Sequence, residues 1–228
     1  GKCDWHRGDV VLFLSNIIES HLNMAHSRGI RLLYAPKQQK AVCDFVPDYA
    51  QKVVCNLVTN AIKFSKEGSE VLVSLDVEDD MLQMRVADFG SGISQDDQQR
   101  IFEPFYQTES DKKNVGSGVG LALVKQIVSA LNGSISLVSK VGEGSVFTVR
   151  IPVKAPEGVE VKSLESLGSV PTSILLNAEN DFMPETDRSA SISEADDADD
   201  DNQSDTRQLV LIVEDNADVA EYMTMQLK

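Results

Sequence analysis

Two asparagines and a lysine lie on one face of a predicted helix over residues 53–65. Its apolar residues recur at spacings of three and four, which is typical of an amphipathic helix. Asn56 and Asn60 are four residues apart and Lys63 follows three residues later, so their side chains point the same way. Amide oxygens beside an ammonium group suit a hard cation and phosphate. A solvated polar stripe is an equally good interpretation of this helix taken alone.

Asp88 ends a predicted strand over residues 81–88 and is followed closely by Gly90 and Gly92. An ionised carboxylate only accepts hydrogen bonds, so it suits an exocyclic amine. Two glycines separated by one residue let the backbone approach something flat very closely. The alternative is a turn residue at the end of a hairpin, and the two glycines argue against it.

Three alternating glycines, Gly116, Gly118 and Gly120, open a predicted helix over residues 118–131. Free backbone N–H groups and the helix dipole make such an entry an anion site. No Gly-Lys-Ser/Thr follows, so this is not a Walker loop. The strand–glycine–helix unit of a dinucleotide fingerprint is also missing.

Four motifs occur in a fixed order along the chain: an asparagine helix, an Asp-x-Gly-x-Gly turn, a Phe-x-x-Phe pair and a glycine-rich loop. This order closely resembles the N, G1, F and G2 boxes of the ATP-binding catalytic domain of sensor histidine kinases, over residues 9–153. The same ATPase group includes DNA gyrase, the mismatch-repair ATPases and a heat-shock chaperone. The resemblance implies an α/β fold, a two-layer sandwich of the Bergerat type with a mixed sheet and three main helices on one face.

The resemblance also implies roles for single residues, with ATP and Mg²⁺ as cofactors. Asn60 would bind Mg²⁺, Asn56 would support the phosphate side, and Asp88 would accept a hydrogen bond from the adenine amino group. The other implied ATP-binding residues are Lys63, Gly90, Gly92, Ile93, Lys112, Lys113, Gly116, Gly118, Gly120 and Leu121. Lys63 would either neutralise phosphate charge or be an ordinary exposed lysine.

A polar segment without periodicity, residues 106–115, suits a mobile lid over a bound ligand. Lys112 and Lys113 lie in it, and clamping phosphates and plain exposure are equally good interpretations of the pair. Phe102 and Phe105 precede it. Because aromatic residues three apart are more often packing anchors than ligand contacts, we interpret both as support for the lid.

The chain lacks a convincing phosphate acceptor. His6, His21 and His26 are each followed by a residue that is not acidic, so none has the neighbour expected to act as a base. By resemblance the acceptor histidine would lie on a separate dimerisation domain, and we predict ATP binding without self-phosphorylation. A non-catalytic, nucleotide-sensing module of the same fold is the alternative. A gyrase-type ATPase fits poorly, because those enzymes carry a catalytic glutamate where Asn56 stands.

The formal charge of −15 is unevenly distributed. Residues 1–153 carry a net −2, residues 154–208 a net −10 and residues 209–228 a net −3. The middle segment is rich in Ser, Glu and Asp, so we predict a flexible linker there. No basic face favours nucleic acid. The cysteines, Cys3, Cys43 and Cys55, have no metal-ligand spacing and are predicted to be free thiols.

Residues 209–228 resemble the first strand and helix of a response-regulator receiver domain, with Glu214 and Asp215 as its acidic pair. One strand and one helix cannot close a core, so this part should be a truncated domain. No apolar run approaches the ~18–20 residues of a membrane helix. Because the chain starts abruptly, we expect a piece of the cytoplasmic portion of a membrane-anchored bacterial hybrid sensor, with a receiver domain as a further partner.

Other elements follow from local patterns. We predict one long helix over residues 9–27, capped by Asp9, and a short helix over 94–100. The predicted strands cover residues 30–35, 40–45, 70–78, 81–88, 134–140 and 145–152, with a hairpin turn at Asp79 and Asp80.

Overall fold

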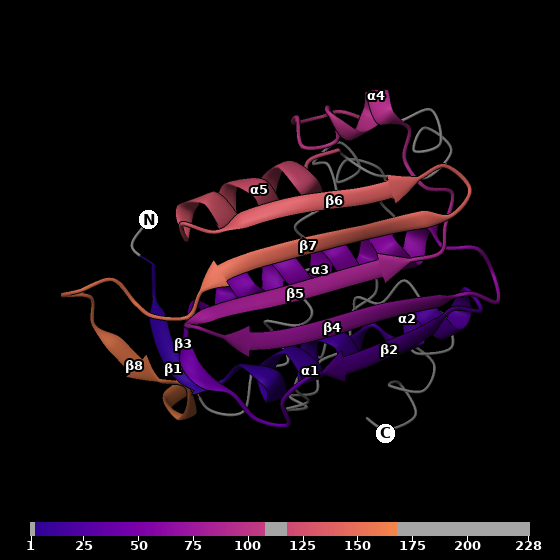
Figure 1. Ribbon diagram of the computed structural model, residues 1–228. Coiled ribbons are helices and arrows are strands. Elements are labelled where there is room, and N and C mark those ends of the chain that lie inside the picture. Colours follow the sequence, from indigo (N-terminus) through magenta and orange to yellow (C-terminus); the bar gives the residue numbers. More distant parts are fainter. Residues whose placement is uncertain (1–2, 108–117, 168–228) are drawn as a thin grey trace, which may run out of the picture. The chain divides into compact units, whose positions relative to one another are not determined.

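A five-stranded mixed sheet forms one layer of the molecule (Figure 1). The structure, a computed structural model, describes residues 3–107 and 118–167. The strand order is β2–β4–β5–β7–β6, with β2 parallel to β4 and every other pair antiparallel. The strands are β2 (Arg31–Pro36), β4 (Glu70–Glu78), β5 (Met81–Asp88), β6 (Ser134–Lys140) and β7 (Gly144–Pro152).

The three long helices cover one face of this sheet, and α3 lies between α1 and α5 (Figure 1). The helices are α1 (Val10–Ser20), α2 (Leu22–Ser27), α3 (Pro47–Phe64), α4 (Gln95–Gln98) and α5 (Gly120–Ala130). The core between the layers includes Val54, Leu57, Val58 and Ile62 of α3 and Val71, Val73, Val86 and Val149 of the sheet. The predicted two-layer α/β sandwich is therefore confirmed.

Local chemistry accounts for several element boundaries. The Asp9 carboxylate caps α1 by accepting a hydrogen bond from the Val11 N–H at 3.1 Å. Pro47 begins α3, where its missing N–H costs no helical hydrogen bond. Asp79 and Asp80 both have positive φ, 51° and 58°, as a two-residue turn matched to the twist of β4 and β5 requires.

The single helix predicted over residues 9–27 is wrong, because the structure breaks it at His21. The Ser20 hydroxyl donates to the Ile17 carbonyl at 2.6 Å, and the His21 ring nitrogen Nδ1 lies 2.8 Å from the same oxygen. The His21 N–H bonds instead to the Ile18 carbonyl at 3.0 Å, which tightens the last turn of α1. Side chains that compete for a backbone carbonyl in this way end a regular helix.

A second, three-stranded sheet in the order β3–β1–β8 was not predicted. Its strands are β1 (Trp5–Asp9), β3 (Val42–Phe45) and β8 (Val161–Ser163), and a short 3₁₀ helix, η2 (Leu164–Leu167), follows. The linker expected from residue 154 thus differs from the structure in its first part, which is built into this sheet. The rest of that segment and the receiver-like end with Glu214 and Asp215 lie outside the described residues.

Two further predictions from the sequence, on the cysteines and on membrane helices, can be compared with the structure. Cys3, Cys43 and Cys55 form no disulfide among the described residues, and Cys43 and Cys55 are buried. Among the helices of residues 3–107 and 118–167, none is long and apolar enough to cross a membrane.

Candidate functional site

Asn56 lies in the middle of α3, and the first residue of α5, Gly120, lies against it. Its amide Nδ2 donates to the Lys52 carbonyl at 2.7 Å, which fixes the orientation of the side chain. A Cβ added to Gly120 would lie 2.3 Å from the Asn56 Oδ1. Only glycine therefore lets the first turn of α5 approach the asparagine so closely. The structure brings together two of the predicted site residues from different boxes.

Asn60 and Lys63 follow Asn56 toward the end of α3, and both are half-buried. The Lys63 Nζ lies 5.0 Å from the centre of the Phe64 ring, within the range of a cation–π contact. The Lys63 carbonyl accepts a hydrogen bond from the Arg28 guanidinium at 3.4 Å. The predicted face of two amides and one ammonium group is present on a helix that the core holds in place.

Asp88 ends β5 with only 7% of its surface exposed. Its Oδ1 accepts a hydrogen bond from the Gly90 N–H at 2.9 Å, and the backbone N–H and hydroxyl of Ser145, its register partner on β7, lie beside the carboxyl. Burial raises the pKa of the Asp88 carboxyl above its ordinary value, although these donors partly oppose the shift. The carboxyl is therefore desolvated and held in one orientation, as a hydrogen-bond acceptor for a specific ligand group would be.

Gly90 and Gly92 allow close approach, but the neighbour is the protein's own backbone. A Cβ at Gly90 would lie 2.1 Å from the Phe64 carbonyl oxygen, and one at Gly92 would lie 2.0 Å from that of Lys140. Gly90 also pairs with Ser65 in an isolated bridge. The expectation that these glycines make room for a flat ligand is thus revised. Gly90 lets the turn after β5 lie against the end of α3, which carries Asn60 and Lys63, and Gly92 lets it lie against the end of β6.

Gly118 and Gly120 both shape the entry to α5. Gly118 has φ of +70°, and its carbonyl accepts a hydrogen bond from the Phe105 N–H at 3.0 Å. The first N–H groups of α5 have no partner within the helix and can serve an anion. Ile93 and Leu121 are partly buried against the core. Lys112, Lys113 and Gly116 lie outside the described residues.

The two phenylalanines behave differently. Phe102 is partly buried and its ring meets that of Phe147 edge-on, with centroids 6.4 Å apart, so its interpretation as a packing residue is confirmed. Phe105 is 78% exposed, so the expectation that its ring packs is wrong. Its positive φ of 64° serves the turn that its N–H closes with Gly118.

Several residues near the site were missed by the sequence analysis. The Tyr106 hydroxyl donates to the Asp97 carboxylate at 2.5 Å, and the Arg100 guanidinium lies 4.3 Å from the centre of the tyrosine ring. Ser145 touches Asp88 from the neighbouring strand. The Asp–x–x–Arg spacing beside an aromatic residue is a weak signal, and the Ser145 contact depends on strand order.

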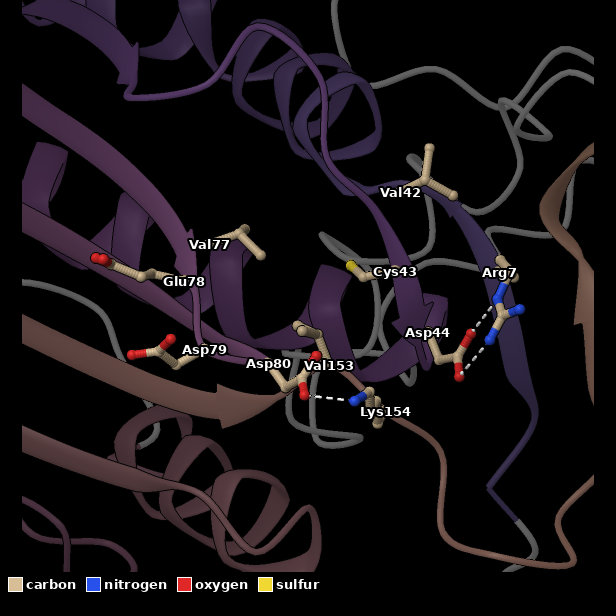
Figure 2. A pocket seen from close by; sticks show the side chains of 10 residues that line it. All are labelled: Arg7, Val42, Cys43, Asp44, Val77, Glu78, Asp79, Asp80, Val153 and Lys154. Carbon is tan, nitrogen blue, oxygen red and sulfur yellow. Dashed lines mark hydrogen bonds and ion pairs between the residues drawn. The ribbon is translucent and has the colours of Figure 1, made fainter.

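A hollow at the other end of the sheet contains none of the predicted site residues (Figure 2). The Arg7 guanidinium bonds both oxygens of Asp44, at 2.7 and 3.1 Å, and Lys154 pairs with Asp80. The first pair joins β1 to β3, and the second joins the residue after β7 to the β4–β5 turn. The Asp44 N–H also donates to the Val153 carbonyl at 3.0 Å, which ties the small sheet to the end of β7. Because both basic groups of the hollow, Arg7 and Lys154, are paired with carboxylates, we interpret it as a structural contact between segments.

Comparison with known proteins gives one matching family. Residues 46–155 match the family described as histidine kinase-, DNA gyrase B- and HSP90-like ATPases. The matched segment contains every predicted ATP-binding residue. Among the described residues, no group of three or more His, Cys, Asp or Glu side chains could hold a metal ion.

Curated relatives and solved structures agree with this match. The chain is 32% identical over 173 residues to the sensor protein EvgS of Escherichia coli strain K12, covering 73% of this chain and 14% of EvgS. It is 40% identical over 123 residues to the sensor histidine kinase RcsC of the same strain, covering 53% of this chain and 13% of RcsC. The chain thus spans only a small part of these relatives.

Among solved structures, full-length ShkA in complex with AMPPNP superposes with a TM-score of 0.61 and 27% identity, covering 68% of this chain and 32% of ShkA. The nucleotide-free catalytic domain of the histidine kinase ThkA has a TM-score of 0.59 at 19% identity, covering 67% of this chain and 99% of that domain. The ThkA likeness supports the fold alone.

Proposed function

We propose that this chain, whose residues 46–155 match the family of histidine kinase-, DNA gyrase B- and HSP90-like ATPases, is the catalytic ATP-binding domain of a hybrid sensor histidine kinase. It would donate the γ-phosphoryl group of Mg-ATP to a histidine on a separate dimerisation domain, in cis or in trans. The observation that carries this proposal is the convergence on α3, where Gly120 touches Asn56 and Gly90 touches the helix end beside Asn60 and Lys63.

The donor groups present fit a magnesium nucleotide. Asn60 supplies an amide oxygen, the type of neutral hard ligand that Mg²⁺ accepts alongside phosphate oxygens and water. The first N–H groups of α5, which have no partner within the helix, suit phosphate, and the buried Asp88 suits the adenine amino group. Bound Mg²⁺ would neutralise phosphate charge as the phosphoryl group leaves.

Each side chain then has a defined task. Asp88 fixes the base, with Ile93 and Leu121 offering apolar surface beside it. Asn56 and Asn60 orient the phosphate and metal side, and Lys63 lowers the negative charge there. Lys112, Lys113, Gly116 and Gly118 complete the proposed phosphate contacts. Phosphoryl transfer needs positioning and charge neutralisation more than covalent chemistry, so this chain needs no nucleophile of its own.

The partners follow from the same proposal. The acceptor histidine would lie on the dimerisation domain of the same kinase, because none of His6, His21 and His26 is followed by an acidic residue. The receiver-like end would belong to a receiver domain that takes the phosphoryl group onward, with residues 168–208 as an acidic tether. In a cell, the chain would be part of the cytoplasmic portion of a membrane-anchored sensor.

Two measurements test this function. Calorimetric titration with Mg-ATP should show binding by the wild-type chain, with loss of binding in Asn60→Ala and in Asp88→Ala. The matched control is Asn16→Ala, which removes an exposed amide from α1. Unchanged affinity in either site variant would reject that residue's role.

Labelled Mg-ATP with the dimerisation domain added in trans then separates the kinase from its alternative. Phosphohistidine on the added domain is expected. Nucleotide binding with no transfer would instead support a non-catalytic nucleotide-sensing module. A wild-type chain that fails to bind Mg-ATP at millimolar concentration would refute both.

A further inference from the structure

Three polar side chains form a row across the end of the large sheet. Asp88 of β5 pairs in register with Ser145 of β7, and Ser145 pairs with Ser139 of β6. Asp88 is 7% exposed and Ser145 is 5% exposed, while Ser139 is half-buried. A polar row in this position interrupts an otherwise apolar inner face, so its members need hydrogen-bond partners.

The hydroxyl of Ser139 meets three different segments. It accepts a hydrogen bond from the Ile93 N–H at 2.9 Å and donates to the Gly144 carbonyl at 2.9 Å. Its Oγ also lies 3.0 Å from that of Ser145. Because the single Ser139 proton goes to Gly144, the Ser145 hydroxyl is the donor in this pair. Ser145 also faces Asp88 in the register of β5 and β7, so neighbouring polar groups run from Ile93 through Ser139 and Ser145 to the buried carboxyl.

The turn after β5 is also clamped onto the end of β6. The Gln98 amide Nε2 donates to the Ile93 carbonyl at 2.8 Å and to the Ser139 carbonyl at 3.1 Å. The Gly142 N–H donates to the Ser91 carbonyl at 2.7 Å. The position of this turn, and with it the surface that Ile93 offers, therefore depends on the backbone and hydroxyl around Ser139.

We propose that Ser139 is a positioning residue for adenine recognition, acting through Ser145 on the orientation of Asp88 and through the Ile93 N–H on the turn that flanks the base. This inference rests on the proposed function, since it deepens the assignment of Asp88 as the acceptor of the adenine amino group. Ser139 itself touches no ligand in this account. Its effect is on the base end of the nucleotide and not on the phosphate end.

The test compares Mg-ATP with Mg-ITP, whose base carries an oxygen in place of the adenine amino group. Loss of one neutral hydrogen bond in Ser139→Ala should weaken Mg-ATP binding about fivefold, with less than about twofold change for Mg-ITP. Ser139→Thr keeps the hydroxyl and should restore the wild-type preference. Ser136→Ala, on the exposed face of the same strand, is the matched control and should bind like wild type.

Each outcome of the calorimetric titrations either supports or overturns the inference about Ser139. Equal losses for both nucleotides in Ser139→Ala would show a general structural effect and overturn the inference, as would wild-type affinity for both. Failure of Ser139→Thr to restore the preference, in a variant that unfolds at the wild-type temperature, would also overturn it. A wild-type chain that binds neither nucleotide refutes the proposed function itself, so the two failures are distinct.

Discussion

Replacing Gly120 with alanine tests whether the contact between α5 and Asn56 serves nucleotide binding or only packing. The added Cβ would lie 2.3 Å from the Asn56 Oδ1 and 3.4 Å from its Cγ, well inside the normal contact distance. The neighbour is a side chain and not backbone, so the Asn56 amide can move away. Moving it breaks the 2.7 Å hydrogen bond to the Lys52 carbonyl.

The expected change in stability is small because two effects oppose each other. Alanine in place of glycine in a helix stabilises by up to about 1 kcal/mol. Loss of the Asn56–Lys52 hydrogen bond costs about 1 kcal/mol. The free energy of unfolding should therefore stay within about 1 kcal/mol of wild type, a shift in melting temperature of a few degrees.

Nucleotide binding should change much more. If the Asn56 amide supports the phosphate side of the site, its displacement removes a hydrogen bond to a charged group, which is worth about 1.5–3 kcal/mol. The affinity for Mg-ATP should fall between about tenfold and a hundredfold. Isothermal titration calorimetry measures this, with thermal unfolding of the same samples as the stability reading.

Two further variants distinguish an effect through Asn56 from a general effect of changing α5. Ser129→Ala changes an exposed position near the other end of α5 and should leave affinity unchanged. In the Asn56→Ala background, Gly120→Ala no longer meets the amide, so its effect on affinity should largely vanish, as expected of coupled residues. Wild-type affinity of Gly120→Ala, or additive effects in the double variant, would refute the reasoning.

Three other predictions follow from the charges and boundaries of the domain. Asp88→Asn should raise the melting temperature at neutral pH while weakening Mg-ATP binding at least about tenfold. Because burial raises the folded-state pKa of Asp88 above its unfolded value, the stability that the protonated carboxyl contributes is complete below about pH 4 and declines as the pH rises through the folded pKa. The gain in melting temperature of Asp88→Asn should therefore disappear in acid. A gain that is independent of pH in thermal scans would contradict this. Burial also raises the pKa of the Cys43 thiol to about 12, so iodoacetamide at pH 8 should leave Cys43 unmodified by mass spectrometry until the protein is unfolded. Finally, a chain ending at Val153 should unfold about 2 kcal/mol more easily than one ending at Leu167, because it loses β8 and the Leu164 side chain that packs on Gly8; equal denaturant midpoints would show that the segment adds nothing.

Local patterns were sufficient to predict the elements of the main sandwich. The hairpin at Asp79 and Asp80, the cap at Asp9 and the periodic helix α3 each depend on neighbours in sequence, and the structure confirms them. The break at His21 depends on which side chain takes the Ile17 carbonyl, and helical periodicity carries no such information.

The small sheet was beyond that kind of prediction. β1 has no clear alternation, and β8 is three residues long in a segment of acidic composition. Both strands exist because they pair with each other and because Asp44 accepts hydrogen bonds from Arg7 and from the Ala155 N–H at 3.2 Å. Tertiary pairing of this kind overrides a weak local preference, so the ordered domain extends past the boundary that composition predicted.

In the candidate site, the order of motifs predicted which residues gather but not what joins them. The position of Ser145 between Asp88 and Ser139 requires the strand order β5–β7–β6, which no single segment encodes. The exposed Phe105 shows the converse error. Its type predicted packing, whereas the structure uses its backbone to close the turn with Gly118.

The glycines of the site allow close contacts between different segments of the protein, so a substitution at them can change stability and nucleotide binding together. Gly90 and Gly92 meet backbone carbonyls of Phe64 and Lys140, which cannot move without shifting α3 or β6. A side chain at either position should therefore reduce stability and nucleotide affinity together. Gly120 meets a side chain, so there the two properties should separate. Because these contacts are made by the chain itself, Asn56, Asp88 and the start of α5 are held in place before any ligand arrives, which lowers the ordering cost of binding.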